Sequence, residues 1–84
     1  MMRIEQIREP IKVRADFSGG QITPLAFKRR EETHAVGRVN CRWKDQQGGE
    51  TSYYFSVEAG GDIYEIRLRL SDMTWWMERV VLDG

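Results

Sequence analysis

The feature that most constrains the fold is a period-two alternation of apolar and polar residues, in segments separated by glycine pairs. Segments 11–17, 53–59 and 64–70 each place an apolar side chain at every second position. Because successive side chains of a β-strand point to opposite faces, this period is typical of half-buried strands. Gly19-Gly20, Gly48-Gly49 and Gly60-Gly61 supply the positive φ angles that tight hairpin turns need. The sequence therefore predicts antiparallel strands connected by hairpins.

Length and turn spacing limit the architecture further. The chain has 84 residues, which allows one domain, and further turn signals at 30–32 and 71–73 leave room for five to six strands. We predict a single domain over residues 1–84, with an N-terminal arm at 1–10 and an antiparallel β meander over 11–83. Because six short strands cannot build two full sheets, we expect an all-β fold with one small, strongly bent antiparallel sheet or a partly open barrel.

The third segment, 33–44, departs from the alternation near its start. Val39, Cys41 and Trp43 share one face, but Val36 is out of phase with them. Either Val36 is exposed, or a bulge at Gly37 shifts the strand face. With the apolar face of each segment turned inward, the predicted structural core is Phe27, Val39, Cys41, Trp43, Phe55, Val57, Tyr64, Ile66, Trp75 and Met77.

Three other segments leave alternatives open. Pro24 lies within segment 21–29 and cannot donate to a ladder, so this strand is at an edge or is interrupted there. The last segment, 74–82, carries apolar residues on both faces, which indicates either barrel closure or a partner subunit. Residues 1–10 suit a short helix or a strand that covers a sheet edge.

Composition excludes several classes of protein. The longest apolar run is three residues, whereas a membrane-spanning helix needs about 20 and a signal peptide about 7–15. The single cysteine, Cys41, cannot form an internal disulfide, and one cysteine with one histidine cannot supply a thiolate or imidazole zinc site. We therefore expect a cytoplasmic protein with no membrane association, no metal and no cofactor.

The sequence also lacks a recognisable catalytic set. A nucleophile–base pair would need His34 beside Cys41 or a serine. These two residues are seven positions apart, which places them on opposite faces of a regular strand and roughly 20 Å apart along it. Each glycine pair lies in a hairpin with no helix after it, so no phosphate-binding loop is predicted. We expect no catalytic residues and no enzymatic activity.

The zero net charge hides an asymmetry between the two halves of the chain. Residues 1–44 carry ten Lys/Arg and five Asp/Glu, giving +5, whereas residues 45–84 carry three and eight, giving −5. Pairing across neighbouring strands would be ordinary sheet chemistry. The alternative is a basic surface for single-stranded nucleic acid, with an aromatic ring to stack on bases. Its predicted members are Lys28, Arg30, Arg38, Arg42, Lys44 and Tyr54.

A protein interface is the other functional class that the sequence supports. Val36, Tyr54 and Trp76 are apolar or aromatic residues on the expected outer face, and such patches often mark interfaces. Unpaired strand edges also offer β-strand addition. Since an isoelectric point near 6.6 argues against strong non-specific binding to phosphates, the sequence favours a protein partner or self-association, homo-oligomers included, over nucleic acid.

A spaced set of residues in this chain resembles a known family. The pattern F-x-x-R-x(5)-V-x-x-V-x-x-x-W is followed by Tyr54-Phe55-x-Val57, Gly61-x-Ile63-Tyr64-Glu65-Ile66 and Trp75-x-Met77-x-Arg79-Val80. Over roughly residues 10–83 the chain is similar to a small bacterial domain family of unknown function. That domain also occurs as a C-terminal extension on some Y-family DNA-polymerase-like proteins. The family pattern has Trp-Arg-Gly where this chain has Arg29-Arg30-Glu31. The resemblance implies an all-β module that either stands alone or is carried by a DNA-handling enzyme, such as a DNA repair polymerase.

Overall fold

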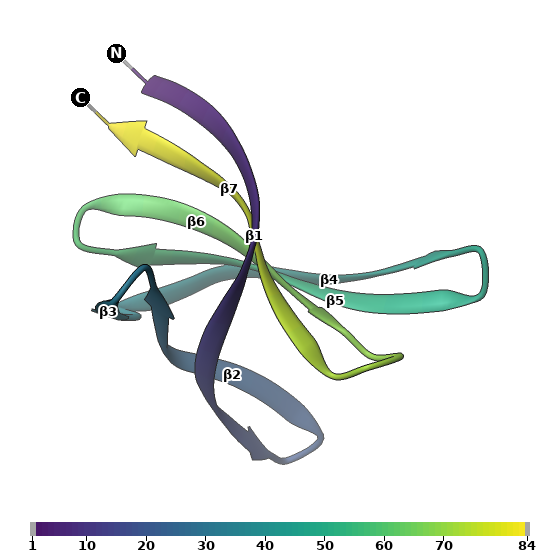
Figure 1. Ribbon diagram of the computed structural model, residues 1–84. Coiled ribbons are helices and arrows are strands. Elements are labelled where there is room, and N and C mark those ends of the chain that lie inside the picture. The colour runs from purple at the N-terminus through teal and green to yellow at the C-terminus, as the bar shows by residue number, and fades with distance from the viewer. Residues whose placement is uncertain (1, 84) are drawn as a thin grey trace.

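The computed structural model describes residues 2–83, so the expected domain ends, Met1 and Gly84, lie outside the described residues. This part of the chain folds into seven strands joined by short turns (Figure 1). The strands are β1 (Met2–Ser18), β2 (Gln21–Arg29), β3 (Glu32–Ala35), β4 (Arg38–Gln47), β5 (Glu50–Ala59), β6 (Asp62–Arg69) and β7 (Thr74–Asp83).

All seven strands belong to one antiparallel sheet, in the order β3-β2-β1-β7-β6-β5-β4. The all-β class and the single, bent, unclosed sheet confirm the coarse prediction. The strand count exceeds the predicted five to six because the third segment is interrupted at Val36 and Gly37, between β3 and β4. Residues 2–10 are strand, which decides between the two alternatives for the N-terminal arm.

The long strand β1 connects the two halves of the sheet. Its first part, Met2 to Ile11, pairs with β7, and its second part, Lys12 to Ser18, pairs with β2. The chain termini therefore lie at one end of the sheet, while the β1–β2, β4–β5 and β6–β7 turns lie at the other (Figure 1).

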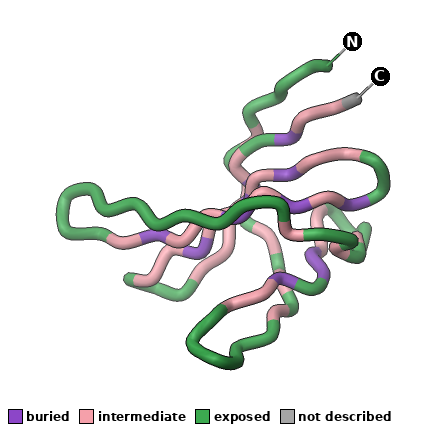
Figure 2. The backbone as a smooth tube through the Cα atoms, turned by 180° about the vertical axis from the view of Figure 1, so that it is seen from behind, coloured by how far each residue is buried: buried purple, intermediate pink, exposed green. Residues whose placement is uncertain are grey.

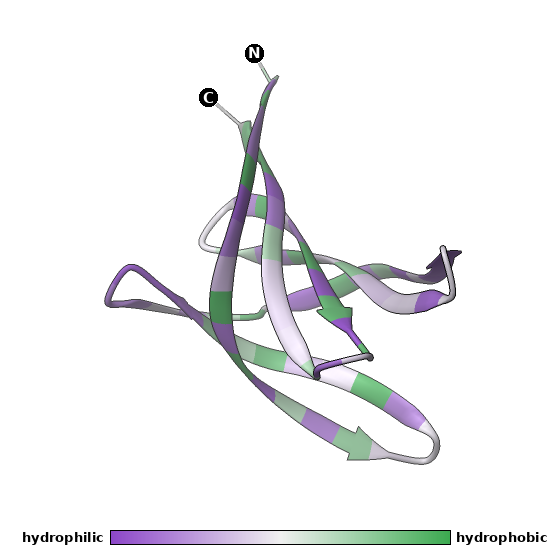
Figure 3. Cartoon of the chain, turned by 45° about the vertical axis from the view of Figure 1, so that its right-hand side comes forward, coloured by the Kyte–Doolittle hydropathy of each residue, from purple (hydrophilic) through white to green (hydrophobic). Residues whose placement is uncertain are grey.

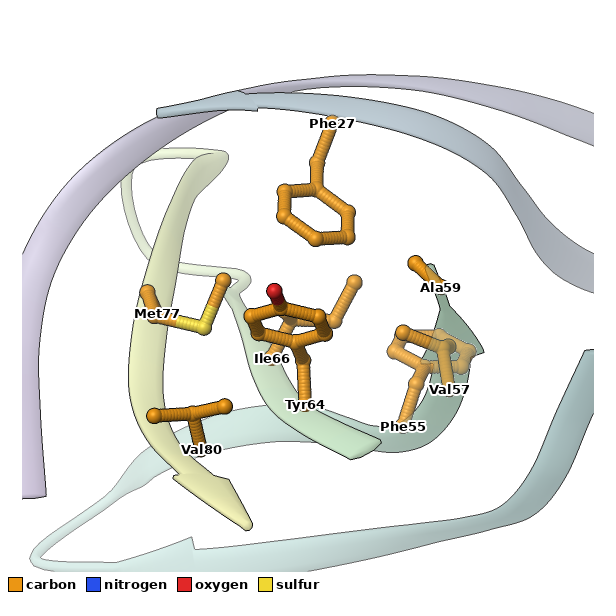
Figure 4. Close-up of a cluster of buried hydrophobic side chains, with 8 residues drawn as sticks. All are labelled: Phe27, Phe55, Val57, Ala59, Tyr64, Ile66, Met77 and Val80. Atoms are coloured by element: carbon orange, nitrogen blue, oxygen red, sulfur yellow. The ribbon is translucent and has the colours of Figure 1, made fainter. Parts of the chain in front are cut away.

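The core lies on the inner face of the bent sheet. Phe27 points from β2 toward Tyr64 and Ile66 on β6 (Figure 4), and the rings of Phe27 and Tyr64 meet edge to face with their centroids 4.9 Å apart. Val39 and Trp75 are half-buried and pack against this cluster. The predicted core residues that are confirmed as buried are Phe27, Phe55, Val57, Tyr64, Ile66 and Met77.

The predicted burial of Cys41 and Trp43 is wrong. Cys41 is exposed, and Trp43 retains 39% of its accessible surface. The cause is a bulge in β4: the register with β5 shifts between Val39 and Cys41, leaving Asn40 without a partner. Because one extra residue inverts the face of every residue that follows it, Val39 stays on the inner face while Cys41 and Trp43 turn outward. Of the two alternatives for this segment, a bulge is therefore present, but it lies at Asn40, three residues after Gly37, and Val36 is half-buried.

A second bulge explains why β7 has apolar residues on both faces. The register of β6 with β7 passes from Glu65–Arg79 to Ile66–Met77, so Glu78 is the extra residue. After this shift, Met77 and Val80 lie in the same core although they are an odd number of positions apart. β7 is therefore an ordinary one-sided strand, and its sequence pattern does not require a partner subunit.

Pro24 lies where the sequence predicts an interruption. β2 pairs with β1 through Arg14–Ala26 and then Ala15–Pro24, so Leu25 bulges out of the register. On its other side, β2 pairs with β3 only from Ala26 to Arg29. The stretch from Gln21 to Leu25 is consequently a free edge, where the missing amide proton of a proline costs no ladder hydrogen bond.

Candidate functional site

Two edges of the sheet, formed by β2 and by β4 with its partner β5, approach each other at Val36 and Gly37 and then diverge. The Val36 amide donates to the Leu25 carbonyl of β2 at 2.9 Å, and the next amide, Gly37, donates to the Glu58 carbonyl of β5 at 2.8 Å. Beyond Gly37 the chain follows β5 and leaves β2. Among the described residues, neither 21–25 of β2 nor β4 pairs with a further strand on this side. We call the opening between these two edges the seam; the β4–β5 hairpin projects away from the β1–β2 hairpin across it (Figure 1).

The β4 bulge determines which side chains enter the seam. After Asn40, Arg42 pairs in register with Phe55 and Lys44 with Tyr53. Cross-strand partners share a face, so both cations lie on the inner face, beside the ring of the core residue Phe55. Without the extra residue they would lie on the outer face, as the sequence alternation predicts.

A groove occupies the seam between β2 and the β4–β5 hairpin. Its volume is about 410 Å³, which falls within the range of small-ligand sites. The lining combines four aromatic rings, two cations and one side-chain amide, and contains no carboxylate. The lining residues are Gly20, Gln21, Ile22, Arg42, Trp43, Lys44, Tyr53, Tyr54 and Phe55.

Arg42 crosses the seam to the opposite edge. Its Nη2 donates to Thr23 Oγ1 at 3.4 Å. With the Gln21 amide oriented to present its oxygen, that oxygen accepts from Arg42 Nη1 at 2.9 Å and from Nη2 at 3.0 Å. Both partners are neutral, so the guanidinium is held in position while its positive charge remains uncompensated.

The ion pairs divide the predicted basic surface into two groups. Arg42 and Lys44 form no ion pair with any carboxylate in the described part of the chain, and together with Tyr54 they line the groove. The other three predicted residues lie outside the groove and face carboxylates. Their contacts are Lys28–Glu31 at 3.8 Å, Arg30–Glu9 at 2.7 Å and Arg38–Glu58 at 3.9 Å.

An aromatic row runs from the rim of the groove across the outer face. Trp43 stacks on Tyr54 with centroids 5.3 Å apart and planes inclined by 5°. In register, Tyr54 faces Arg67 and Arg67 faces Trp76, whose ring lies 5.9 Å from the Arg67 guanidinium carbon. Two members of the predicted protein interface, Tyr54 and Trp76, therefore belong to one row. The third, Val36, packs against the core at the point where the edges meet.

The β6–β7 turn is fixed by a carboxylate network. Asp72 accepts from Arg69 Nη2 at 2.6 Å and from the Thr74 hydroxyl at 2.6 Å, and the Trp76 indole donates to Thr74 Oγ1 at 2.9 Å. The Arg69 and Thr74 hydrogen bonds hold the pKa of the Asp72 carboxyl well below its usual range. This network fixes the Trp76 end of the aromatic row.

Asp72→Asn is expected to lower the free energy of unfolding at pH 7. A carboxyl whose pKa is depressed in the folded state stabilises the fold above its unfolded pKa of about 4, and this contribution disappears as the pH falls through the folded pKa. The stability difference between wild type and variant, measured by urea denaturation from pH 7 to pH 2, should therefore shrink below about pH 4. A difference that stays constant over this range would contradict the role of the Asp72 charge.

The two residues considered for nucleophilic chemistry lie in different surroundings. His34 on β3 stacks on Phe27 with centroids 5.0 Å apart and lies 5.8 Å from the Tyr64 ring. Cys41 lies on the exposed, outward face of β4. His34 is thus part of the aromatic packing beside the core.

Sequence reasoning missed the β2 side of the groove and two of its rings, Tyr53 and Trp43. Gln21 and Ile22 line it from β2, and Tyr53 lines it from β5. Pro24 was the available signal, because it marked this stretch of β2 as an edge. The other missed ring, Trp43, was assigned to the core because Asn40 gave no sign of a bulge.

Comparisons with known proteins found no match to a family model, to a curated protein or to a solved structure. Among residues 2–83 there is no helix with the length and apolar character needed to cross a membrane. The same residues contain no group of three or more His, Cys, Asp or Glu side chains arranged to hold a metal ion.

Proposed function

We propose that this protein is a non-enzymatic module that binds single-stranded nucleic acid in the groove of the seam. The observation that carries the proposal is the lining of the groove: Arg42 and Lys44 lie among four aromatic rings, with no carboxylate beside them. Seven of the 13 cations form ion pairs elsewhere in a chain with no net charge. Two cations left free beside aromatic rings suit a ligand that combines phosphates with planar bases.

The groove favours a single strand over a duplex. Rings such as Trp43 and Tyr53 can stack only on bases whose faces are accessible, and in a duplex those faces are covered by neighbouring base pairs. With only two cations in the groove, electrostatic attraction is modest, which agrees with the near-neutral isoelectric point. The resemblance to a domain carried by DNA-polymerase-like proteins supports the same ligand. A reducing cytoplasm suits this function, since the exposed Cys41 has no second cysteine to pair with.

The free strand edges favour a second candidate function, interaction with another protein. β4 pairs only with β5, and residues 21–25 of β2 pair only with β1 among the described residues. An extended peptide could hydrogen-bond to either edge by strand addition. However, β4 carries two charged side chains, Arg42 and Lys44, and a bulge, and these features oppose unselective strand addition at the edges of natural sheets. This candidate therefore ranks below nucleic acid.

Binding of fluorescein-labelled single-stranded DNA, measured by anisotropy at several salt concentrations, tests the proposal. Two neutralised phosphates predict that log K falls with log salt with a slope of about −1.4, from about −0.7 per phosphate on a single strand. Replacing Arg42 and Lys44 together by alanine should bring the slope close to zero. Trp43→Ala, on an exposed ring, should weaken binding by roughly five- to 150-fold, because a stacked base contributes about 1–3 kcal/mol.

Arg38→Ala is the matched control, because Arg38 is an exposed cation on the same strand and faces Glu58 outside the groove. This variant should bind as wild type does. Equal binding to poly-glutamate would show that the groove selects negative charge alone and would reject the proposal. Binding that is unchanged in the Arg42/Lys44 double variant would also reject it. An extended peptide that competes with DNA at micromolar concentration would favour the second candidate.

A further inference from the structure

The N-terminal half of β1 is a free strand edge at the end of the sheet away from the groove. On one side, residues 2–6 pair with β7. On the other side, pairing with β2 begins only at Lys12, so residues 2–6 have no partner strand there in the described part of the chain. All five of these residues are exposed (Figure 2). Two residues limit the free edge in the direction of β2. Arg8 has a positive φ of 54°, which departs from strand geometry, and Pro10 has no amide proton to donate to a further strand. An exposed edge of this length is a template for pairing with another strand.

An aliphatic row leads across the sheet to this edge. Ile63 on β6 is in register with Val81 on β7, and Val81 is in register with Ile4 on β1. Ile63 and Val81 are half-buried, but Ile4 at the end of the row keeps 61% of its surface exposed, and Met2 keeps 66%. Figure 3 shows the alternating hydrophobic and hydrophilic residues where β1 and β7 run together to the termini. The row therefore ends abruptly at an open edge.

The charges beside Ile4 identify what can occupy this edge. Arg3 and Glu5 flank Ile4 on either side and point to the opposite face. When a strand pairs antiparallel with a copy of itself centred on this isoleucine, position 3 of each copy faces position 5 of the other. Each arginine then faces a glutamate, and the two isoleucines face each other. The sequence Arg3-Ile4-Glu5 is thus self-complementary in charge. An unrelated strand would match it only if it carried an acidic residue opposite Arg3 and a basic residue opposite Glu5.

We propose that two copies of this chain associate through antiparallel pairing of Met2 to Gln6 of β1, with Ile4 facing Ile4 and Arg3 facing the second copy's Glu5. This pairing joins the two aliphatic rows into one continuous row across both sheets, and it satisfies backbone groups along the free edge. The groove lies at the opposite end of each sheet, so ligand binding and pairing do not compete. The dimer is independent of the ligand proposed for the groove.

A charge-swap series with light scattering on the full chain tests this pairing. Wild type should be a dimer that dissociates on dilution. Arg3→Glu and Glu5→Arg each place like charges at both symmetric contacts, so each variant alone should associate at least roughly tenfold more weakly. An equimolar mixture of the two variants should form a heterodimer, since one copy then carries two glutamates and the other two arginines at these positions. The variant with both changes should dimerise as wild type does.

Lys12→Glu is the matched control, because it makes the same charge change on the same strand beyond the proposed interface. It should leave the dimer intact, and circular dichroism should show the same fold for every variant. The proposal is overturned if wild type is monomeric at all concentrations, or if either single variant dimerises as wild type does. Failure of the mixture to associate would overturn the register centred on Ile4.

Discussion

Phe27→Ala is expected to destabilise the domain strongly. Phe27 is 1% exposed and reaches from β2 to β6, where its ring meets Tyr64 edge to face, and it also stacks on His34 of the neighbouring β3. Removing a fully buried phenylalanine ring costs about 3–5 kcal/mol through lost burial and the cavity left behind. Because the total stability of a small domain is about 5–15 kcal/mol, this loss removes a large part of it. It also releases β2, which forms one wall of the groove.

Trp43→Ala provides the contrast that makes this expectation specific. The indole of Trp43 is larger than the Phe27 ring, but 39% of the residue is exposed, and it stacks on one side only, against Tyr54. We expect a cost below about 1.5 kcal/mol, the range of an aromatic pair at the surface. Urea denaturation followed by circular dichroism measures both variants. Comparable losses in the two would show that the inner and outer faces of the sheet have been assigned wrongly.

The sequence was informative where alternation continued without interruption. Segments 53–59 and 64–70 gave β5 and β6 and four of the confirmed core residues, because each of their apolar positions lies on one face of a regular strand. Glycine pairs located three of the turns, where the backbone adopts positive φ. The apolar–polar alternation was sufficient to predict these strands, because the face that it predicts to be buried is also the face that packs in the core.

Bulges account for most of what the sequence did not reveal. Asn40 and Glu78 are the extra residues in β4 and β7, and neither residue type marks a bulge as glycine can. Each insertion exchanges the faces of the residues after it, which moved Trp43 from the predicted core to the surface and brought Val80 into the core. Register depends on pairing with the neighbouring strand, so it cannot be read from one segment alone.

The candidate site also depended on strand register. Arg42, Lys44 and Tyr54 were among the predicted binding residues, but the groove exists only because β4 leaves β2 after Gly37 and turns at Asn40. Charge counting could not separate Arg42 from Arg38, since both are exposed cations on β4. The difference between them is tertiary: Arg38 faces Glu58, whereas Arg42 faces the neutral side chains of Thr23 and Gln21.

Glu78→Ala is expected to cost about 2–3 kcal/mol, more than the removal of an exposed carboxylate such as Glu58. Glu78, the bulged residue of β7, forms an ion pair with Arg67, whose Nε lies 3.1 Å from a Glu78 carboxylate oxygen without a hydrogen bond between them. The two side chains are only 15% and 21% exposed. Without this carboxylate, the Arg67 guanidinium stays largely buried beside Trp76 with its charge uncompensated, which is costly. Part of the loss is offset, because the pKa of neighbouring Glu65 is raised mainly by burial and further by the charge of Glu78, and removing Glu78 relieves that repulsion.

A double-mutant cycle separates the ion pair from the burial of its side chains. Arg67→Met combined with Glu78→Leu should be less destabilising than the sum of the two single changes, because apolar replacement of both partners leaves no buried charge. Glu58→Ala is the control: Glu58 faces Arg38 at 3.9 Å with both side chains well exposed, so its loss should cost less than about 0.5 kcal/mol. Urea denaturation of wild type and the five variants gives the free energies. If Glu78→Ala is as mild as Glu58→Ala, solvent screens the Arg67 pair, and the bulge at Glu78 serves only to restore the inward face of β7.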